Sequence, residues 1–131
     1  MAKAIHTMIR VFDADKAMGF YKKAFGLDVA DRFDFDNFSL IYLRNTEADF
    51  ELELTVNNGQ EAAYSHGDVY GHLAFVVDDF ESEHTRMQDE NLDPTKIFEM
   101  TFPNGTPARA FFVTDPDGYK IEVVERGWRF Q

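Results

Sequence analysis

The chain has 131 residues, 44% of them hydrophobic and 15% aromatic, which is enough apolar material for the core of one compact domain. Its formal net charge of −11 repels phosphate backbones and anionic lipid, so we expect no nucleic-acid partner and no membrane partner. It has no cysteine, which excludes disulfides, thiolate metal sites and cysteine nucleophiles. With no signal-like apolar segment at the N-terminus and no membrane span, the sequence predicts a soluble, cytoplasmic protein.

Strand and helix patterns alternate through the first half of the chain. Residues 3–12 alternate as a strand that places His6 and Arg10 on one face. Asp13 is expected to cap a helix that ends at Gly26. Strand-like runs follow at 28–33, 38–44 and 50–56, and a turn at 57–59 closes the set. The predicted buried stripe of the helix has helical spacing: Ala17, Phe20, Tyr21 and Ala24.

The same pattern then starts again. A strand is predicted at 72–77, a weaker helix from Phe80 to about Glu90, and strands near 95–100, 109–114 and 119–125. His6 and His72 are offset by 66 residues (72 − 6). The sequence therefore predicts an α+β fold of two β-α-β-β-β modules, the first at about 1–60 and the second at about 70–126. Residues 61–69 would be a linker and 127–131 a short tail.

Two histidines and two glutamates occupy equivalent places in this repeat. His6 begins the first strand of its module and is followed 47 residues later (53 − 6) by Glu53; His72 is followed 50 residues later (122 − 72) by Glu122. Burying an ionised carboxylate without a partner is very costly, and a nearby cation offsets that cost. Two imidazoles and two carboxylates suit Ni, Co, Zn, Mn or Fe(II). We therefore predict a divalent metal that, if six-coordinate, keeps positions for water or substrate.

Each of these residues also has an ordinary interpretation. A single strand histidine is more often a hydrogen-bonded structural residue, and a single strand glutamate usually faces solvent. Equivalent placement of all four favours a shared site. Glu51 shares a strand face with Glu53 and is an alternative ligand. His66 and His84 are predicted to be surface residues.

Four segments carry a family resemblance: HTMIRV at 6–11, ELTVNNG at 53–59, YGHLAFVVDD at 70–79 and DPDGYKIE at 115–122. They resemble glyoxalase I (lactoylglutathione lyase), a member of the vicinal-oxygen-chelate superfamily, in which paired modules form curved mixed sheets around a metal-binding cleft. The resemblance implies a homodimer with metal sites at its interface. The turn at 57–59 matches the family register that selects Glu53 over Glu51. The implied metal ligands are His6, Glu53, His72 and Glu122.

The resemblance also implies an activity. The enzymes of this family isomerise the methylglyoxal–glutathione hemithioacetal to S-lactoylglutathione by proton transfer through a metal-bound enediolate. Glu122 would be the catalytic base, Glu53 a ligand with a lesser role in proton transfer, and glutathione the thiol cosubstrate. Arg10 and Asn57 match positions that bind the glutamyl end of glutathione. The short chain is similar to the compact bacterial type, which favours Ni or Co.

The segment at 101–108 departs from the family pattern. The family commonly has a basic group there for the glycyl carboxylate of glutathione, whereas this chain has no positive charge until Arg109. Another thiol or another α-hydroxycarbonyl substrate is therefore an alternative. So is another metal-dependent reaction of the superfamily, by a dioxygenase or an epimerase. A metal-free small-molecule-binding protein, like bleomycin-resistance proteins, is the alternative from another functional class.

Overall fold

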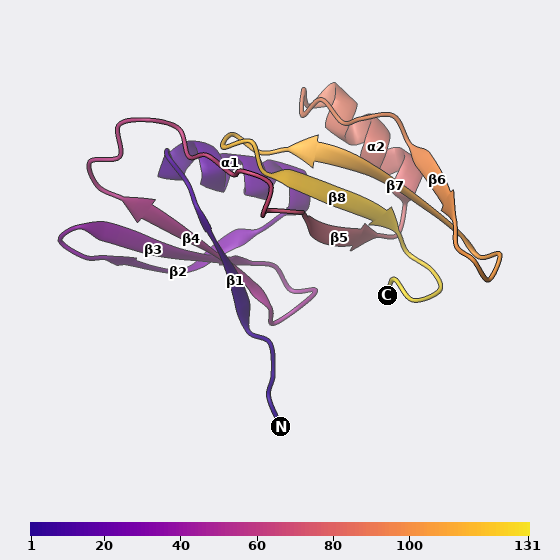
Figure 1. The fold of residues 1–131 in the computed structure, drawn as a ribbon, viewed down its shortest axis with the longest axis horizontal. Helices are drawn as coiled ribbons and strands as arrows, with labels where there is room; N and C mark the ends of the chain where they lie inside the picture. Colours follow the sequence, from indigo (N-terminus) through magenta and orange to yellow (C-terminus); the bar gives the residue numbers. More distant parts are fainter. The chain divides into compact units, whose positions relative to one another are not determined.

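A computed structural model describes residues 1–131, which divide into two compact units, Met1–His66 and Gly67–Gln131. We call these units the first and second modules. The first contains β1 (His6–Arg10), α1 (Ala14–Phe25), β2 (Asp28–Asp34), β3 (Phe38–Arg44) and β4 (Glu51–Asn57). The second contains β5 (Leu73–Val77), α2 (Phe80–Asp89), β6 (Phe98–Thr101), β7 (Pro107–Thr114) and β8 (Lys120–Glu125) (Figure 1). The predicted α+β fold of two β-α-β-β-β modules is confirmed.

Each module holds one four-stranded mixed sheet with the same topology. The strand orders are β1-β4-β3-β2 and β5-β8-β7-β6. The first strand of each module pairs parallel with the last, β1 with β4 and β5 with β8, and the remaining pairs are antiparallel. This pairing brings the start of a module beside its end, although they are about 50 residues apart in the chain.

Helix α1 begins and ends as the sequence predicts. The side chain of Asp13 accepts a hydrogen bond from the Lys16 backbone N–H at 3.0 Å, and Gly26 ends the helix with a φ of 65°. Of the predicted stripe, Ala17, Tyr21 and Ala24 are buried, whereas Phe20 is half-buried.

Helix α2 is less well capped than α1. The side chain of Asp79 makes no capping hydrogen bond. Phe80 and Met87 are buried, while Arg86 bridges Glu83 and Glu90 on the outer surface at 2.7 Å each. Neither α1 nor α2 is long and apolar enough to cross a membrane.

The two faces of each sheet have different surroundings. On β7, the Phe111 ring lies 5.4 Å from that of Phe80 and 4.8 Å from that of His84, both on α2. The next residue, Phe112, points to the opposite face, where its ring lies 5.5 Å from the His72 ring. The face that α2 covers is thus the core. The other face carries the predicted site residues.

Two predicted strands are shorter than expected. The run at 3–12 forms a strand only at His6–Arg10, because its partner β4 begins at Glu51 and the chain turns after residue 11 toward the cap of α1. The run at 95–100 forms a strand only from Phe98. Thr95 is adjacent to β7, and its backbone N–H donates to the Phe112 carbonyl at 2.9 Å. The return bond goes to its side chain, since Oγ1 of Thr95 accepts the Phe112 N–H at 2.9 Å.

A candidate metal centre

In the first module, His6 and Glu53 lie side by side. The Nε2 atom of His6 is 2.9 Å from Oε2 of Glu53. Glu53 is only 8% exposed, although it lies in the middle of β4. It lies between the buried Leu52 and Leu54, which point to the helix-covered face. The imidazole therefore supplies a polar partner to a carboxylate that would be costly to bury alone.

The second module repeats this arrangement. The Nε2 atom of His72 is 2.5 Å from Oε2 of Glu122, and the Glu122 side chain is 16% exposed. His72 directly precedes β5, and Glu122 lies in β8. The turn before β8 fixes this placement: the buried Asp115 side chain accepts the backbone N–H groups of Asp117 and Tyr119 at 2.9 Å each.

The strand register explains why the two pairs match. Glu53 lies opposite Met8, and Glu122 lies opposite Ala74. In both modules the glutamate is thus opposite the residue two positions after the histidine, and the histidine reaches it diagonally across the parallel strands. Glu51 is directly opposite His6, but its nearest basic partner is Arg44 at 3.9 Å. The structure brings His6 together with Glu53 rather than with Glu51.

An aromatic residue flanks each pair. On β3, Tyr42 lies opposite Glu53, and its ring lies 6.0 Å from the His6 ring. On β7, Phe112 lies opposite Glu122, and its ring lies 5.5 Å from the His72 ring. Tyr42 thus places a phenol opposite Glu53, where the second module places the apolar ring of Phe112 opposite Glu122. Partial burial first, and then the Glu53 charge, raise the pKa of Tyr42 above its ordinary value of 10.0.

The chemistry of each pair fits half of a metal site. Imidazole nitrogen and carboxylate oxygen bind first-row divalent metals at about 2.0–2.2 Å, so two ligand atoms at right angles on one ion lie about 3 Å apart. The separations of 2.9 Å in the first module and 2.5 Å in the second are close to this value. No third His, Cys, Asp or Glu joins either pair to complete a metal site. Each module therefore brings together two candidate ligands.

The two predicted substrate-binding residues lie in the first module. Arg10 is exposed at the end of β1, opposite Thr55 of β4. Asn57 ends β4, and its side-chain Nδ2 donates a hydrogen bond to the Tyr64 hydroxyl at 3.2 Å. Arg10 lies on the same strand face as His6, and Asn57 on the same strand face as Glu53, because each is an even number of positions away. The sequence does not indicate Tyr64 as a neighbour of Asn57. It lies in the irregular segment 61–69, where no helix or strand periodicity shows which way a side chain points.

The other two histidines are half-buried rather than fully exposed surface residues. His84 Nε2 donates a hydrogen bond to the Thr95 carbonyl at 2.7 Å, and its ring packs edge-on against Phe111. His84 therefore connects α2 to the segment before β6. The Nε2 atom of His66 is buried at the end of the first module. Neither histidine lies in one of the two His–Glu pairs.

Arg109 does not supply the cation that the segment 101–108 lacks. It lies on β7, where it shares the helix-covered face with Phe111. Its guanidinium is 2.6 Å from Glu81 and 2.7 Å from Glu125, and it lies 5.1 Å above the Phe80 ring. These hydrogen-bonded carboxylates raise the pKa of Arg109, Glu125 more than Glu81. Arg109 is thus held on the face opposite to the His72–Glu122 pair.

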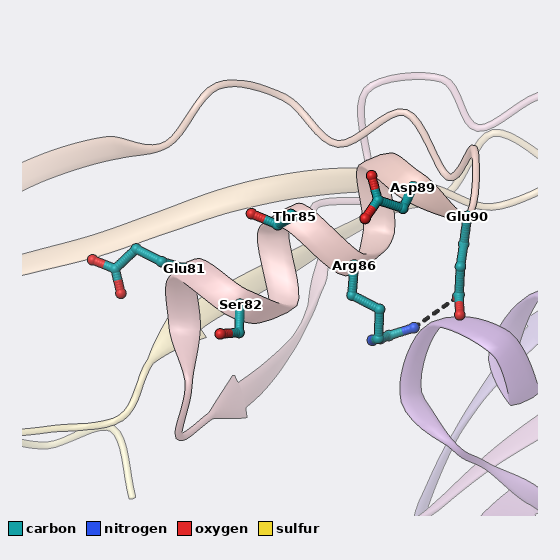
Figure 2. Close-up of a pocket in the computed structure, with 6 residues that line it drawn as sticks. All are labelled: Glu81, Ser82, Thr85, Arg86, Asp89 and Glu90. Carbon is teal, nitrogen blue, oxygen red and sulfur yellow. Dashed lines mark hydrogen bonds and ion pairs between the residues drawn. The ribbon is translucent and has the colours of Figure 1, made fainter.

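A shallow hollow on the outside of α2 is a separate feature. Figure 2 shows its lining side chains along one side of the helix, with an ion pair between Arg86 and Glu90. Such i,i+4 pairs are typical of a solvated helix surface. The hollow lies on the helix side of the sheet, whereas the His72–Glu122 pair lies on the other face. We therefore assign no ligand site to it.

Comparison with known proteins defines the class. The family model described as the Glyoxalase/Bleomycin resistance protein/Dioxygenase superfamily matches residues 3–123. The chain therefore belongs to this superfamily, as the sequence resemblance predicts.

Within the superfamily, the chain is similar to lactoylglutathione lyases. It is 34% identical to that of Haemophilus influenzae, over 92% of this chain and 90% of the relative. It is 36% identical to that of Neisseria meningitidis serogroup A, over 95% and 91%. A solved structure of trypanothione-dependent glyoxalase I from Leishmania major superposes with a TM-score of 0.77 at 32% identity, over 95% of this chain and 87% of that one. This protein is thus a glyoxalase I-like enzyme.

Proposed function

We propose that this protein converts the hemithioacetal of methylglyoxal and glutathione into S-lactoylglutathione. The observation that carries the proposal is the pair of equivalent His–Glu contacts, His6 with Glu53 and His72 with Glu122. Similarity to lactoylglutathione lyases over most of the chain supports the same reaction class.

The two pairs are, in this proposal, the two halves of one coordination sphere. Together they would hold a divalent cation, with Ni or Co favoured and Zn, Mn or Fe(II) also compatible with the donor set. When bound, such a cation acts as a Lewis acid that stabilises negative charge developing on substrate oxygens. We further propose a homodimer in which each site takes one pair from each chain, as the sequence resemblance implies.

Glu122 is the proposed base. The hemithioacetal carries a weakly acidic C–H next to a carbonyl group. Glu122 would take that proton and return it to the neighbouring carbon, while the hydroxyl proton passes from the hemithioacetal oxygen to the former ketone oxygen. The ketone thus becomes an alcohol and the hemithioacetal carbon a thioester. Because both protons are only relocated, no oxidant or reductant is needed. Glu53 would remain mainly a ligand, with a lesser role in proton transfer.

The remainder of the substrate has candidate contacts in the first module. Arg10 and Asn57 would bind the charged glutamyl end, since a guanidinium and an amide complement a carboxylate. Asn57 donates to the Tyr64 hydroxyl in the structure. Substrate binding would therefore exchange one hydrogen bond of the Asn57 amide for another.

A different thiol is a second candidate, and a specific observation favours it. The segment 101–108 has no basic residue, and Arg109 is paired with Glu81 and Glu125 on the helix-covered face. Neither the segment 101–108 nor Arg109 would therefore provide a cation to bind the glycyl carboxylate of glutathione. The glyoxalase I of L. major, 32% identical to this chain, is described as trypanothione-dependent. Thiol preference is thus a variable property among similar proteins.

The test is turnover of methylglyoxal and glutathione by metal-stripped protein resupplied separately with Ni, Co, Zn, Mn or Fe(II). We expect S-lactoylglutathione with at least one metal. Metal binding without turnover on glutathione, trypanothione or a simple thiol would contradict the proposed reaction. It would point to a dioxygenase, tested by oxygen consumption, or to an epimerase, tested by proton exchange. Absence of metal binding would favour a small-molecule-binding protein.

A further inference from the structure

Tyr64 is the hydrogen-bond partner of the Asn57 side chain. The Asn57 Nδ2 atom donates to the Tyr64 hydroxyl oxygen at a distance of 3.2 Å. The phenol is the acceptor in this bond, and no protein group accepts the proton of its own hydroxyl. Because a phenol can donate as well as accept, Tyr64 keeps an unused donor beside Asn57.

The turn after Asn57 holds the end of β4 in place and lets the chain return to it. Asn58 donates to two backbone carbonyls of the β2–β3 turn, from its N–H at 2.9 Å and from its Nδ2 at 3.1 Å. Gly59 then has a φ of 80°, a left-handed conformation that glycine adopts without strain. The half-buried Tyr64 therefore reaches Asn57 although it lies seven residues further along the chain (64 − 57).

Asn57 lies on the strand face that carries the proposed metal ligands of the first module. It is four positions from Glu53 on β4, so about 13 Å of strand separates the two residues. Arg10 of β1 lies opposite the residue two positions before Asn57. This is the diagonal relation in which His6 meets Glu53. A guanidinium, an amide and a phenol, the last from Tyr64, are therefore grouped at one end of this face.

We propose that Tyr64 is a third substrate-binding residue, whose hydroxyl donates a hydrogen bond to the same carboxylate that Asn57 binds. This inference rests on the proposed function, which assigns the glutamyl end of the thiol to Arg10 and Asn57. In the free protein the phenol holds the Asn57 amide. When the substrate binds, the amide gives its N–H to the carboxylate and the phenol donates its own proton. Two donors 3.2 Å apart can bind one carboxylate, since each carboxylate oxygen accepts two hydrogen bonds.

The exchange favours an anionic partner. One hydrogen bond between neutral groups, Asn57 and Tyr64, is replaced by two bonds to a carboxylate. Charge-assisted hydrogen bonds are roughly twice as strong as bonds between neutral groups. A thiol whose far end is neutral gives no such gain. Tyr64 therefore selects for thiols that carry a carboxylate at their far end.

The first test compares the kinetics of Tyr64→Phe with those of a matched control, Tyr70→Phe. The control removes a hydroxyl that donates to the Lys120 carbonyl at 3.3 Å in the second module. Each variant is loaded with the metal that gives turnover. With the hemithioacetal of glutathione, we expect Tyr64→Phe to raise KM by about 10-fold at an unchanged kcat, because one bond to a charged group is lost. Tyr70→Phe should change neither constant. An unchanged KM in Tyr64→Phe overturns the inference.

A second readout does not depend on turnover. Titration calorimetry measures the binding of S-methylglutathione, a thioether that cannot form the hemithioacetal, and of its analogue without the glutamyl α-carboxylate. We expect Tyr64→Phe to bind S-methylglutathione about 10-fold more weakly than the unchanged protein, and the analogue equally well. An equal loss for both thioethers would show a packing defect and overturn the inference.

The same titrations separate this inference from the proposed reaction. If the unchanged protein produces no S-lactoylglutathione but binds S-methylglutathione in a way that depends on Tyr64, the proposed reaction fails while the role of Tyr64 stands. Equal affinity of the unchanged protein for the two thioethers, or no binding of either, overturns the role of Tyr64.

Asn57→Ala decides whether Tyr64 contacts the substrate or only holds the Asn57 amide. If the phenol donates to the carboxylate itself, Tyr64→Phe weakens S-methylglutathione binding further in the Asn57→Ala protein. If Tyr64 acts only by orienting the amide, the double variant binds no more weakly than Asn57→Ala alone. We expect the further loss, and its absence would overturn the proposed contact.

Discussion

Glu122 Oε2 lies 2.5 Å from His72 Nε2, and the two side chains meet diagonally across the parallel strands of the second module. The first module repeats this relationship at 2.9 Å between His6 and Glu53. Both modules have the same strand pairing, so each places one imidazole beside one carboxylate. The repeat therefore provides two imidazoles and two carboxylates in equivalent positions.

Replacing Glu122 by Gln should abolish turnover and leave most of the metal binding. The amide keeps an oxygen ligand but has no basic carboxylate oxygen, so we expect a loss of at least about 100-fold in kcat. Steady-state kinetics and chelator competition measure the two properties separately. The control is Glu51→Gln, since Glu51 is half-buried near Arg44 and is not paired with His6. Near-normal turnover by Glu122→Gln would reject Glu122 as the base.

Replacing His84 by Ala should lower stability without changing metal affinity. The substitution removes a 2.7 Å hydrogen bond to the Thr95 carbonyl and the edge-on contact with Phe111. We expect the free energy of unfolding to fall by about 1–3 kcal/mol, as measured by urea denaturation. His6→Ala should differ from His84→Ala in weakening Ni²⁺ binding, because His6 is a proposed ligand. Weakened metal binding in His84→Ala would contradict the separation of the two roles.

The two helices should differ in their sensitivity to loss of the N-cap residue. Asp13→Ala removes the 3.0 Å hydrogen bond to the Lys16 backbone N–H and should cost about 1 kcal/mol of stability. Asp79→Ala, at the same position of α2, should cost less, because the Asp79 side chain makes no capping hydrogen bond. Urea denaturation of both variants under identical conditions compares them directly. Equal losses would show that the capping bond of Asp13 contributes nothing measurable.

Arg109 should make stability depend on pH in the acidic range. Its hydrogen bonds hold the pKa of Glu125 and of Glu81 below their ordinary value of 4.5. A carboxylate whose pKa is lower in the folded state stabilises the fold above its unfolded pKa, and this contribution is lost as the pH falls through the folded value. Arg109→Gln should therefore be less stable than the unchanged protein at pH 7, with a difference that closes as the pH falls below 4.5.

The control for this experiment is Arg129→Gln. The Arg129 guanidinium lies over the Trp128 ring at 5.9 Å, so its removal changes the net charge equally without removing the bonds to Glu125 and Glu81. We expect a small effect on the urea midpoint that is independent of pH between 7 and 3.5, roughly the range over which carboxylates titrate. An Arg109→Gln difference that stays constant over this range would mean that the two carboxylates do not contribute through their charge.

Sequence alone determined the repeat, the helix ends and the candidate residues. The helix from Ala14 to Phe25 followed from local chemistry, since an aspartate cap and a glycine with positive φ act within a few residues of their own position. Alternation predicts which residues of one strand share a face, so His6 could be placed on the same face as Arg10, and Glu53 on the same face as Glu51. Strand ends were less accurate, as at 3–12 and 95–100, because pairing with a distant partner decides where a ladder stops.

Only the tertiary structure decided the register between strands. Periodicity gives the face of a residue but not which residue of a neighbouring strand lies opposite, since that depends on long-range pairing. The pairing of Tyr42 with Glu53, the contact of His6 with Glu53 rather than Glu51, and the ion pair of Arg109 with Glu125 all depend on it. Repeat spacing thus indicated the candidate ligands, the family resemblance favoured Glu53 over Glu51, and strand register decided what each glutamate faces.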